Sequence, residues 1–324
     1  MQMQNQMFCM NPSYTLTQAH SPSLGHSITM TSFCAKVQTV SIPYTQLKDK
    51  NADLSAKIEQ GFGPNGLGIL SISEVPGYSL WRQNLLQLGP RLANLPEDVK
   101  REIEDPKSRY NFGWSHGKEK LESGKLDLLK GSFYANPILD VPTTEQSLIE
   151  RYPSYCGSNI WPHKALPELE TAFKTLGKLI LDVGLLLAYH CDRYGLTCGM
   201  FTRDSVEIHS PDSDAGLYIK TRTGQIVKVE YGVDEIAYQI GETTEILSSG
   251  RLCATPHCVR APRGDAASGV DRTTFALFMQ PDWDQKLSFP GEVHIHRELI
   301  QSNESLTFGE YTEKLLDKYY HLKM

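Results

Sequence analysis

Apolar residues follow two different spacings along the chain, and the spacing changes near residue 190. Between Pro167 and His190 they recur every three or four residues, which predicts one long core helix opened by the proline. Beyond residue 200 the apolar runs become short and are separated by Gly, Pro, Ser and Asp, a layout typical of antiparallel strands. The first of these runs predict strands over residues 206–209, 216–220 and 225–230, and residues 235–240 lead on to the next stretch.

The stretch from Ile240 to Trp283 continues the strand pattern in three runs. Glu242 to Leu247 and Leu252 to Arg260 flank a Ser-Ser-Gly turn, and Thr273 to Met279 follows a loop rich in Gly and Ala. All three runs are predicted strands. Both faces of the last one are largely apolar, so it should lie inside a sandwich or barrel.

The region before the long helix mixes the two spacings. Val37 to Ile42 and Gly66 to Ser73 are predicted strands, and Asp53 to Phe62 is a predicted helix. Ser79 is the expected N-cap of a further helix, and Pro96 opens another. The whole pattern predicts three parts: a flexible extension at residues 1–35, an N-terminal α/β region at 36–165, and the long helix, strand core and C-terminal helix at 166–324.

The extension is assigned as flexible because residues 1–35 contain no Lys, Arg, Asp or Glu and are rich in Met, Gln, Ser and Thr. A transit peptide would carry arginines, and a secretory signal would have a basic start and an apolar core. Neither feature is present in these residues. Towards the other end of the chain, Thr307-x-x-Glu310 is a capping box that predicts the start of a helix.

Composition narrows the class of protein. The 324 residues carry a formal net charge of -6 without a basic stripe, so a nucleic acid is not an expected partner. Seven scattered cysteines do not form a disulfide framework, which favours a reducing, cytoplasmic location. The longest apolar segment, Leu179 to Tyr189, is interrupted by Asp182 and is too short to span a bilayer, so no membrane partner is expected.

Arg272 and Thr274 are the first candidate site residues. On a strand their side chains point the same way. A guanidinium cannot lose its charge inside a protein, and with a hydroxyl two residues away it forms a fork suited to a carboxylate. The alternative is a structural ion pair between Arg272 and one of the 38 acidic residues.

His257 is the second candidate, on the run that precedes this strand. In an extended chain Cys253, Thr255 and His257 face one way, and Cys258 faces the other. A zinc module of Cys253, His257 and Cys258 would therefore need a bulge to bring its thiolates together. Without a further match, a packed core histidine is the expected role.

The two candidates and their surroundings resemble the 2-oxoglutarate and Fe(II)-dependent oxygenases, in the plant-type group that includes isopenicillin N synthase. The resemblance lies in IGETTEILSSGR, in TPHCVRAP and in DRTTFALFMQPDW. It implies that His257 is an iron ligand, and that Arg272 and Thr274 hold the distal carboxylate of the cosubstrate 2-oxoglutarate. The implied fold is mainly β, with a double-stranded β-helix (jelly roll) core, packed helices and an N-terminal α/β region.

The same resemblance implies two more Fe(II) ligands in an H-x-D motif, for which His190-Cys191-Asp192 is the match. The motif stands at the end of the predicted helix, where side chains two residues apart point about 200° away from each other, so the helix would have to unwind first. In the family, a strand pair that ends in the H-x-D follows the long helix. Here residues 194–196 run straight on, so the usual segment is apparently lacking.

A further histidine, His209, lies close in sequence to Asp212 and Asp214 and is another conceivable ligand set. Pro211 and the serines between them predict a surface turn instead.

The expected function is that of a 2-oxoglutarate and Fe(II)-dependent dioxygenase that oxidises a small organic substrate with molecular oxygen. The alternative is a non-catalytic homologue of the same fold with an incomplete iron site, acting as a binding or interaction module. The segment from Ser108 to Pro137 resembles the part of the family that lies over the pocket mouth. Its aromatic residues would line a substrate pocket or pack under a loop: Tyr110, Phe112, Trp114, Phe133 and Tyr134.

Overall fold

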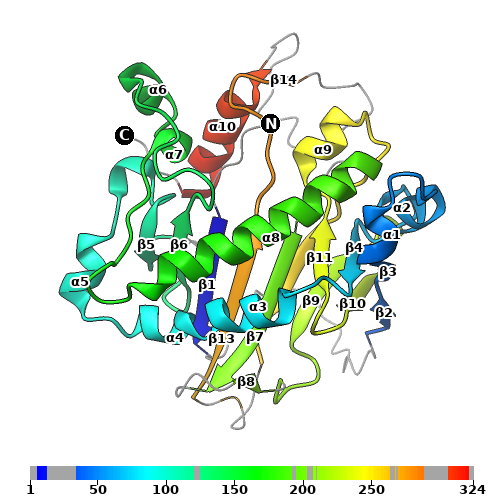
Figure 1. Ribbon diagram of the computed structural model, residues 1–324, viewed down its shortest axis with the longest axis horizontal. Coiled ribbons are helices and arrows are strands. Elements are labelled where there is room, and N and C mark those ends of the chain that lie inside the picture. Colours follow the sequence, from blue (N-terminus) through cyan, green and yellow to red (C-terminus); the bar gives the residue numbers. More distant parts are fainter. Residues whose placement is uncertain are drawn as a thin grey trace, which may run out of the picture.

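Figure 1 shows the computed structural model of the chain. Among the helices of the described residues, none has the length and the apolar content that a bilayer crossing requires. The structure describes residues 6–12, 34–119, 125–191, 195–202, 207–208, 210–262, 267, 269–287 and 306–320.

Short strands and helices alternate in the first half of the chain. Helix α3 does not start at a serine cap as expected, because Gly77, in the left-handed conformation, precedes it and Ser79 lies within its first turn. The elements are β1 (Gln6–Pro12), β2 (Lys36–Gln38), β3 (Val40–Pro43), α1 (Tyr44–Lys48), α2 (Ser55–Phe62), β4 (Ile69–Ser73), α3 (Tyr78–Leu86), α4 (Leu88–Ala93), α5 (Glu97–Glu102), the 3-10 turn η1 (Pro106–Ser108), β5 (Gly113–His116), β6 (Gly131–Ala135), α6 (Gln146–Arg151) and α7 (Pro153–Cys156).

The second half holds the long helix and most of the remaining strands. Helix α8 (Glu168–His190) confirms the prediction from three- and four-residue spacing. The predicted capping box also forms, since the Thr307 amide donates to Glu310 Oε2 at 3.0 Å and the Glu310 amide donates to Thr307 Oγ1 at 3.3 Å. The further elements are β7 (Gly195–Thr202), β8 (Glu207–Ile208), β9 (Gly216–Lys220), β10 (Ile226–Glu230), β11 (Ile236–Gln239), α9 (Glu242–Leu247), β12 (His257–Arg260), β13 (Val270–Leu277), β14 (Lys286–Leu287), β15 (Leu306–Thr307) and α10 (Phe308–Tyr320).

Two of the strands predicted after Ile240 need correction. Residues 242–247 form the helix α9, and the run that begins at Leu252 becomes a strand only at β12. A run of only six residues is too short for its spacing to distinguish a helix from a strand, so tertiary contacts decide the conformation. Glu245 is 7% exposed, and its carboxylate accepts hydrogen bonds from the Ala254 amide at 2.6 Å and from Arg222 Nη2 at 2.9 Å. The helical turn brings that carboxylate within reach of both donors.

Two sheets face each other in the described part of the chain. The large sheet has the strand order β3-β4-β11-β7-β13-β1-β6-β5, with β8 paired to β7, and the small sheet has the order β12-β9-β10-β2. An apolar cluster between them joins Ile69 and Ala237 of the large sheet to Ile219, Val227 and Val229 of the small sheet. The core is therefore a sandwich of mixed sheets, and β13 lies inside it as its apolar faces predict.

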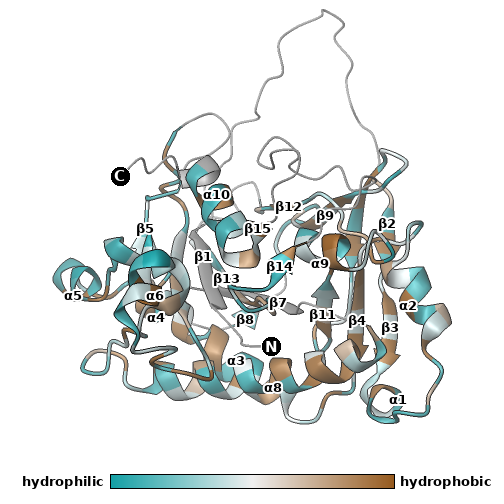
Figure 2. Ribbon diagram, turned by 90° about the horizontal axis from the view of Figure 1, so that it is seen from above, coloured by the Kyte–Doolittle hydropathy of each residue, from teal (hydrophilic) through white to brown (hydrophobic). Residues whose placement is uncertain are grey.

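Helices cover the outer face of the large sheet, with α3 and α8 running along the side opposite the small sheet (Figure 2). Phe275 of β13 packs edge-on against Phe173 of α8, with ring centroids 5.1 Å apart. Tyr238 of β11 donates its hydroxyl to the Ile180 carbonyl at 2.8 Å. Full burial of a side chain of this kind contributes about 1.5–3 kcal/mol, so Phe275 and Tyr238 fix which face of the sheet points toward the helix.

The N-terminal extension contributes a strand. Residues 6–12 form β1, which lies between β13 and β6 and pairs antiparallel with both. The expectation of a flexible extension is wrong for these residues. Cys9 stands opposite Thr274 on one side and Ser132 on the other. Buried backbone groups need hydrogen-bond partners, and β1 supplies them to the two strands that it separates.

Proline at position 9 should disrupt this strand. Because β1 has a partner on each side, the amides of residues 6–10 donate to one neighbour or the other, and a proline removes its donor. We expect Cys9→Pro to lower the free energy of unfolding by about 2 kcal/mol or more, measured by urea denaturation. Cys9→Ala keeps the amide and is the matched control. An equal loss in both variants would contradict the pairing.

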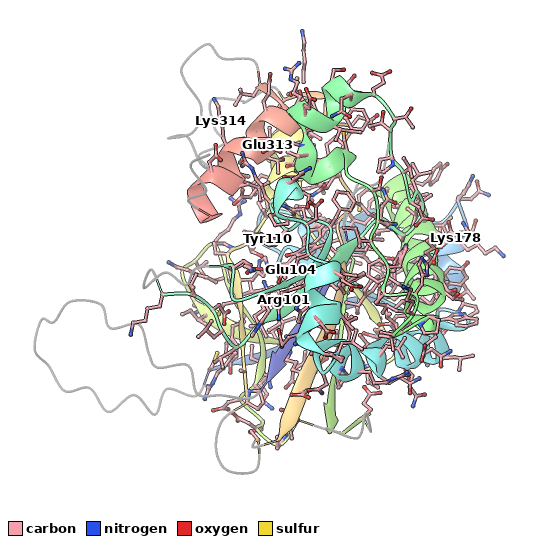
Figure 3. The ribbon with its side chains drawn as sticks, turned by 90° about the vertical axis from the view of Figure 1, so that its left-hand side faces the viewer. Arg101, Glu104, Tyr110, Lys178, Glu313 and Lys314 are labelled. Carbon is pink, nitrogen blue, oxygen red and sulfur yellow. The ribbon has the colours of Figure 1, made fainter. Side chains whose placement is uncertain are left out.

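Ion pairs attach two peripheral elements. Arg82 of α3 is 3% exposed and pairs with Glu207 of β8 through Nη2 to Oε1 at 2.6 Å and Nη1 to Oε2 at 3.1 Å. Arg109, before β5, binds Glu313 and Asp317 of α10 at 3.1 and 2.7 Å. Figure 3, which views the molecule from the left-hand side of Figure 1, labels Glu313 on α10. Breaking a buried pair leaves an uncompensated charge, so these contacts hold β8 and α10 in place.

Asp140 anchors the loop that follows β6 to helix α8. Its carboxylate accepts hydrogen bonds from Lys174 Nζ at 2.6 Å, Trp161 Nε1 at 2.9 Å and Asn159 Nδ2 at 2.9 Å. Burial alone would raise the pKa of this carboxyl group, but the three donors outweigh burial and lower the pKa from 3.8 to about 2. The loop therefore depends on a charged carboxylate.

This shift predicts a pH dependence. A carboxyl group whose pKa is lower in the folded chain adds stability above its ordinary pKa of 3.8, and the contribution disappears as the pH falls toward about 2. At neutral pH, Asp140→Asn should lower the free energy of unfolding by about 0.5–1 kcal/mol. This value is reduced for solvent screening because the Asp140 side chain is 49% exposed. Urea titrations at decreasing pH should show the difference in free energy of unfolding between the parent chain and Asp140→Asn becoming smaller. Asp234→Asn, at an exposed turn, is the control, and a gap independent of pH would contradict the account.

Candidate functional site

The inner face of β13 carries the two residues expected to hold a carboxylate. Side chains alternate along the strand, and Phe275 lies in the cluster under α8. Arg272 and Thr274 therefore point to the opposite face. The strand register agrees. Ala276, on the same face as Thr274, stands opposite Leu196 of β7, and Leu196 stands opposite Ala237 of β11, which packs against the small sheet. Both side chains thus face the space between the two sheets.

The fork formed by these two residues lacks a partner in the described structure. Thr274 Oγ1 is buried and has no hydrogen-bond partner within the described residues. Arg272 is partly buried, and the alternative role considered for it, an ion pair with an acidic residue, is not found in that same part of the chain. An unpaired hydroxyl and an unpaired guanidinium both cost free energy when they leave water. One carboxylate would satisfy both.

His257 faces the same space from the small sheet. It stands opposite Ile219 in the register of β12 and β9, and Ile219 packs against the large sheet. The imidazole is nevertheless exposed, because β12 is an edge strand. Its Nδ1 lies 3.1 Å from the Thr255 carbonyl oxygen, which can only accept, so Nδ1 carries the proton and the lone pair of Nε2 is left for a ligand. His257 and Arg272 therefore belong to different sheets that face each other.

Close backbone contacts fix the segment that leads to His257. Thr255 donates its hydroxyl to the Leu67 carbonyl at 2.7 Å, which ties this segment to the start of β4. Gly68, next to that carbonyl, has a φ of 69°, and a Cβ there would lie 2.7 Å from the Cys253 carbonyl oxygen. Only glycine permits this conformation and this approach without strain. The Gly-rich sequence before β4 is the signal that points to such a contact.

His190 lies on the other side of the large sheet. It ends α8, which covers the outer face, and its Nε2 is 3.2 Å from the Leu47 carbonyl oxygen of α1. Asp192 lies outside the described residues. No group of three His, Cys, Asp or Glu side chains suited to a metal is found among the residues that the structure does describe. An Fe(II) site that joins His190 to His257 does not fit this arrangement.

The other metal sites considered from the sequence are not assembled by the described residues. Cys253 is buried, and burial raises the pKa of its thiol, whereas Cys258 is exposed. These two thiols do not converge on one zinc ion. His209 lies outside the described residues, and Asp212 accepts the Asp214 amide at 2.8 Å in a surface turn.

The aromatic residues between Ser108 and Pro137 belong mostly to the core. Phe112, Trp114 and Phe133 are at most 3% exposed. Of the two roles expected for them, packing under a loop is the one that the structure supports. Tyr134 alternates with Phe133 along β6, so it faces the inner side of the large sheet.

Gln239 is a polar residue of the inner face that no motif singles out. It ends β11 and is 5% exposed, and neither Nε2 nor Oε1 has a hydrogen-bond partner within the described chain. A glutamine between two apolar residues, Tyr238 and Ile240, is the signal that could have indicated it.

Solved structures of other proteins resemble this one, although no protein-family model and no curated protein matches its sequence. A Caulobacter crescentus protein described as belonging to the 2OG-Fe(II) oxygenase family has a TM-score of 0.57 at 15% identity, over 86% of this chain and 98% of that chain. A full-length Neurospora crassa protein, in complex with alpha-KG and thymine, has a TM-score of 0.53 at 15% identity, over 90% and 99% of the two chains. JOX2, in complex with 2OG, Fe and JA, has a TM-score of 0.54 at 13% identity, over 93% and 94%.

The fold is that of the 2OG-Fe(II) oxygenases. At these identities the likeness concerns the arrangement of sheets and helices, and it assigns no role to any residue of the chain. The expectation of an oxygenase-like sheet core with packed helices is confirmed at that level. The roles of Arg272, Thr274 and His257 in this oxygenase fold remain predictions from their geometry.

Proposed function

We propose that this chain is a 2-oxoglutarate-binding protein of the oxygenase fold, in which Arg272 and Thr274 hold the far carboxylate of the cosubstrate. The observation that carries the proposal is a buried Thr274 hydroxyl without a partner, beside a guanidinium that has no ion pair among the described residues. The two oxygens of one carboxylate match the two-pronged guanidinium, and the hydroxyl adds a third hydrogen bond.

The position of the fork supports a ligand with a second polar end. Arg272 and Thr274 point from the large sheet toward the space that His257 faces from the small sheet. A molecule anchored by its far carboxylate would extend into this space and hold its keto-acid end in a single pose. A monocarboxylate of the same length would lack that second contact. A 2-oxo dicarboxylate therefore suits the site better than acetate or a simple fatty acid.

Substitution of either residue of the fork should weaken 2-oxoglutarate binding. We expect Arg272→Ala to weaken 2-oxoglutarate binding by at least about tenfold, which corresponds to about 1.4 kcal/mol. Thr274→Val, which keeps the shape and removes the hydroxyl, should weaken it by roughly threefold to tenfold. The measurement is isothermal titration of the full chain in EDTA, so that no metal contributes.

The matched control is Arg251→Ala, because Arg251 is an exposed arginine on the loop after α9. It should leave 2-oxoglutarate binding unchanged. If Arg251→Ala and Arg272→Ala weaken binding equally, the attraction is one of general charge and the proposed fork is wrong. If the parent chain does not bind 2-oxoglutarate, the proposed function is wrong as a whole.

For iron, the placement of the described residues favours weak binding. His257 has a free Nε2 lone pair, but His190 donates to the Leu47 carbonyl on the far side of the large sheet. A single imidazole does not hold Fe(II) in the way that two histidines and a carboxylate do. We therefore favour the non-catalytic homologue, a binding module of the oxygenase fold. The second candidate is an active dioxygenase that couples oxidation of a small organic substrate by molecular oxygen to decarboxylation of 2-oxoglutarate.

Anaerobic addition of Fe(II) and 2-oxoglutarate distinguishes the two candidates. A ligand complex of iron with a 2-oxo acid gives a weak visible charge-transfer band, and we expect the parent chain to give little or none of it. His257→Ala should remove any residual band, while His163→Ala, at an exposed histidine, should not. A full band that disappears in His190→Ala would contradict the placement of that residue and favour the active dioxygenase.

The remaining partners follow from the same proposal. The Neurospora crassa protein and JOX2 were crystallised with thymine and with JA, both small organic molecules, and we expect a ligand of that size here. Neither a nucleic acid nor a membrane is part of the proposal. A reducing, cytoplasmic compartment suits the free cysteines of the described chain: Cys34, Cys156, Cys191, Cys253 and Cys258.

A further inference from the structure

Gln239, at the end of β11, is a buried amide without a hydrogen-bond partner in the described part of the chain. Its side chain is 5% exposed, and both Nε2 and Oε1 are without a hydrogen-bond partner in the described chain. Among the described residues it is the one buried side-chain amide for which both atoms lack a partner. Buried polar groups are nearly always hydrogen-bonded in folded proteins, so an amide with two orphaned atoms points to a ligand.

Strand geometry directs this amide into the space between the sheets. Tyr238 points to α8 on the outer face, where its hydroxyl bonds the helix backbone, so Ala237 and Gln239 point the other way. Ala237 lies in the apolar cluster between the two sheets. Ile69, which stands opposite Gln239 on β4, lies in the same cluster. The amide is therefore set in an apolar wall of the inter-sheet space.

The edge strand β12 leaves this space open to solvent. Ile219, which stands opposite His257 in the small sheet, belongs to the same cluster as Ile69. Gln239 and His257 thus approach that cluster from the two facing sheets. The imidazole is exposed, so solvent reaches this edge of the small sheet.

The chemistry of a primary amide defines what it can bind. Nε2 donates and Oε1 accepts, and the two atoms lie side by side. A carboxylate would satisfy Nε2 but would set a negative charge against Oε1. A ketone would satisfy Nε2 and leave Oε1 unpaired. A group with an N–H next to a C=O satisfies both atoms through two parallel hydrogen bonds.

We propose that Gln239 binds a second ligand of this protein through such an edge, and that this ligand is a small apolar molecule with a lactam or imide group. The inference rests on the proposed function and names the class of molecule that would bind together with 2-oxoglutarate. β7 lies between the strand that carries Gln239 and the strand that carries Arg272 and Thr274. The register sets Ala237 level with Ala276, so the amide and the fork lie on one face of the large sheet but at different levels along its strands.

Three ring compounds of one size test the inference. 2-Piperidone has the N–H next to the C=O, N-methyl-2-piperidone lacks the donor, and cyclohexanone lacks the nitrogen. Each is titrated by ligand-observed NMR into the full parent chain, Gln239→Leu and Gln60→Leu, in the absence of 2-oxoglutarate. Gln60 is an exposed glutamine of α2 and provides the matched control.

We expect 2-piperidone to bind the parent chain and Gln60→Leu equally. Its affinity for Gln239→Leu should fall at least about tenfold, because a site built around a hydrogen-bonding pair rejects a partner that lacks one half. The parent chain should prefer 2-piperidone over the other two rings, and Gln239→Leu should not distinguish among the three.

Thermal unfolding without ligand checks the premise. Leucine has nearly the volume of glutamine and removes two unpartnered polar atoms, so Gln239→Leu should unfold at an equal or higher temperature than the parent chain. That result also shows that any loss of binding is not a loss of fold. A lower unfolding temperature would mean that the amide is bonded within the folded chain, and it would overturn the inference.

The remaining outcomes separate this inference from the proposed function. Equal binding of 2-piperidone by the parent chain and Gln239→Leu, or no binding by the parent chain, overturns the proposed ligand class. Either result leaves the proposed function intact if 2-oxoglutarate still binds in a way that depends on Arg272. Conversely, binding of 2-piperidone that depends on Gln239, without any binding of 2-oxoglutarate, supports the amide site and overturns the cosubstrate fork.

Discussion

The alternation of side chains along β13 decides which groups face the space between the two sheets. Phe275 is fully buried beneath α8, and burial of such a ring contributes about 1.5–3 kcal/mol. A slip of one residue would turn that ring away and bring Arg272 under the helix, where an unpaired charge is far more costly. The two effects favour the same register. The inward direction of Arg272 and Thr274 therefore follows from the packing of the opposite face.

The same layers separate the two histidines that an iron site would need. The apolar stripe of α8 lies on the outer face of the large sheet, and His190 is carried there with it, whereas His257 belongs to the small sheet on the inner side. Nitrogens bound to one metal ion lie roughly 3 Å apart, because each bond is about 2 Å long. A whole sheet stands between these two rings. An iron site that joins these two histidines therefore does not fit the described part of the fold.

Local patterns in the sequence predicted the parts of the fold that depend on local spacing. The α8 stripe, the interior strand β13 and the capping box of Thr307 and Glu310 are confirmed, because each depends on residues a few positions apart. The pairing of β1 with β13 joins residues more than 250 positions apart, and no local pattern encodes it. Helix α9 was mistaken for a strand, since the contacts of Glu245 with Ala254 and Arg222 decide its conformation.

The candidate site shows the same division. Arg272 and His257 stand out in the sequence because charged and imidazole groups on apolar strands are unusual, and Thr274 because its hydroxyl follows Arg272 by two residues. Their inward direction could be argued from alternation alone. Gln239 could not be found in that way, because its importance depends on what fails to contact it across two sheets. The side of the sheet on which His190 lies likewise depends on how α8 packs.

A crystal structure of the full chain grown with 2-oxoglutarate tests the central claim most directly. The account predicts the ligand between the two sheets, with one carboxylate bonded to the guanidinium of Arg272 and the hydroxyl of Thr274, and with the ring of His257 facing the same space. A ligand bound elsewhere, or a guanidinium and an imidazole that open onto opposite sides of the large sheet, would contradict it.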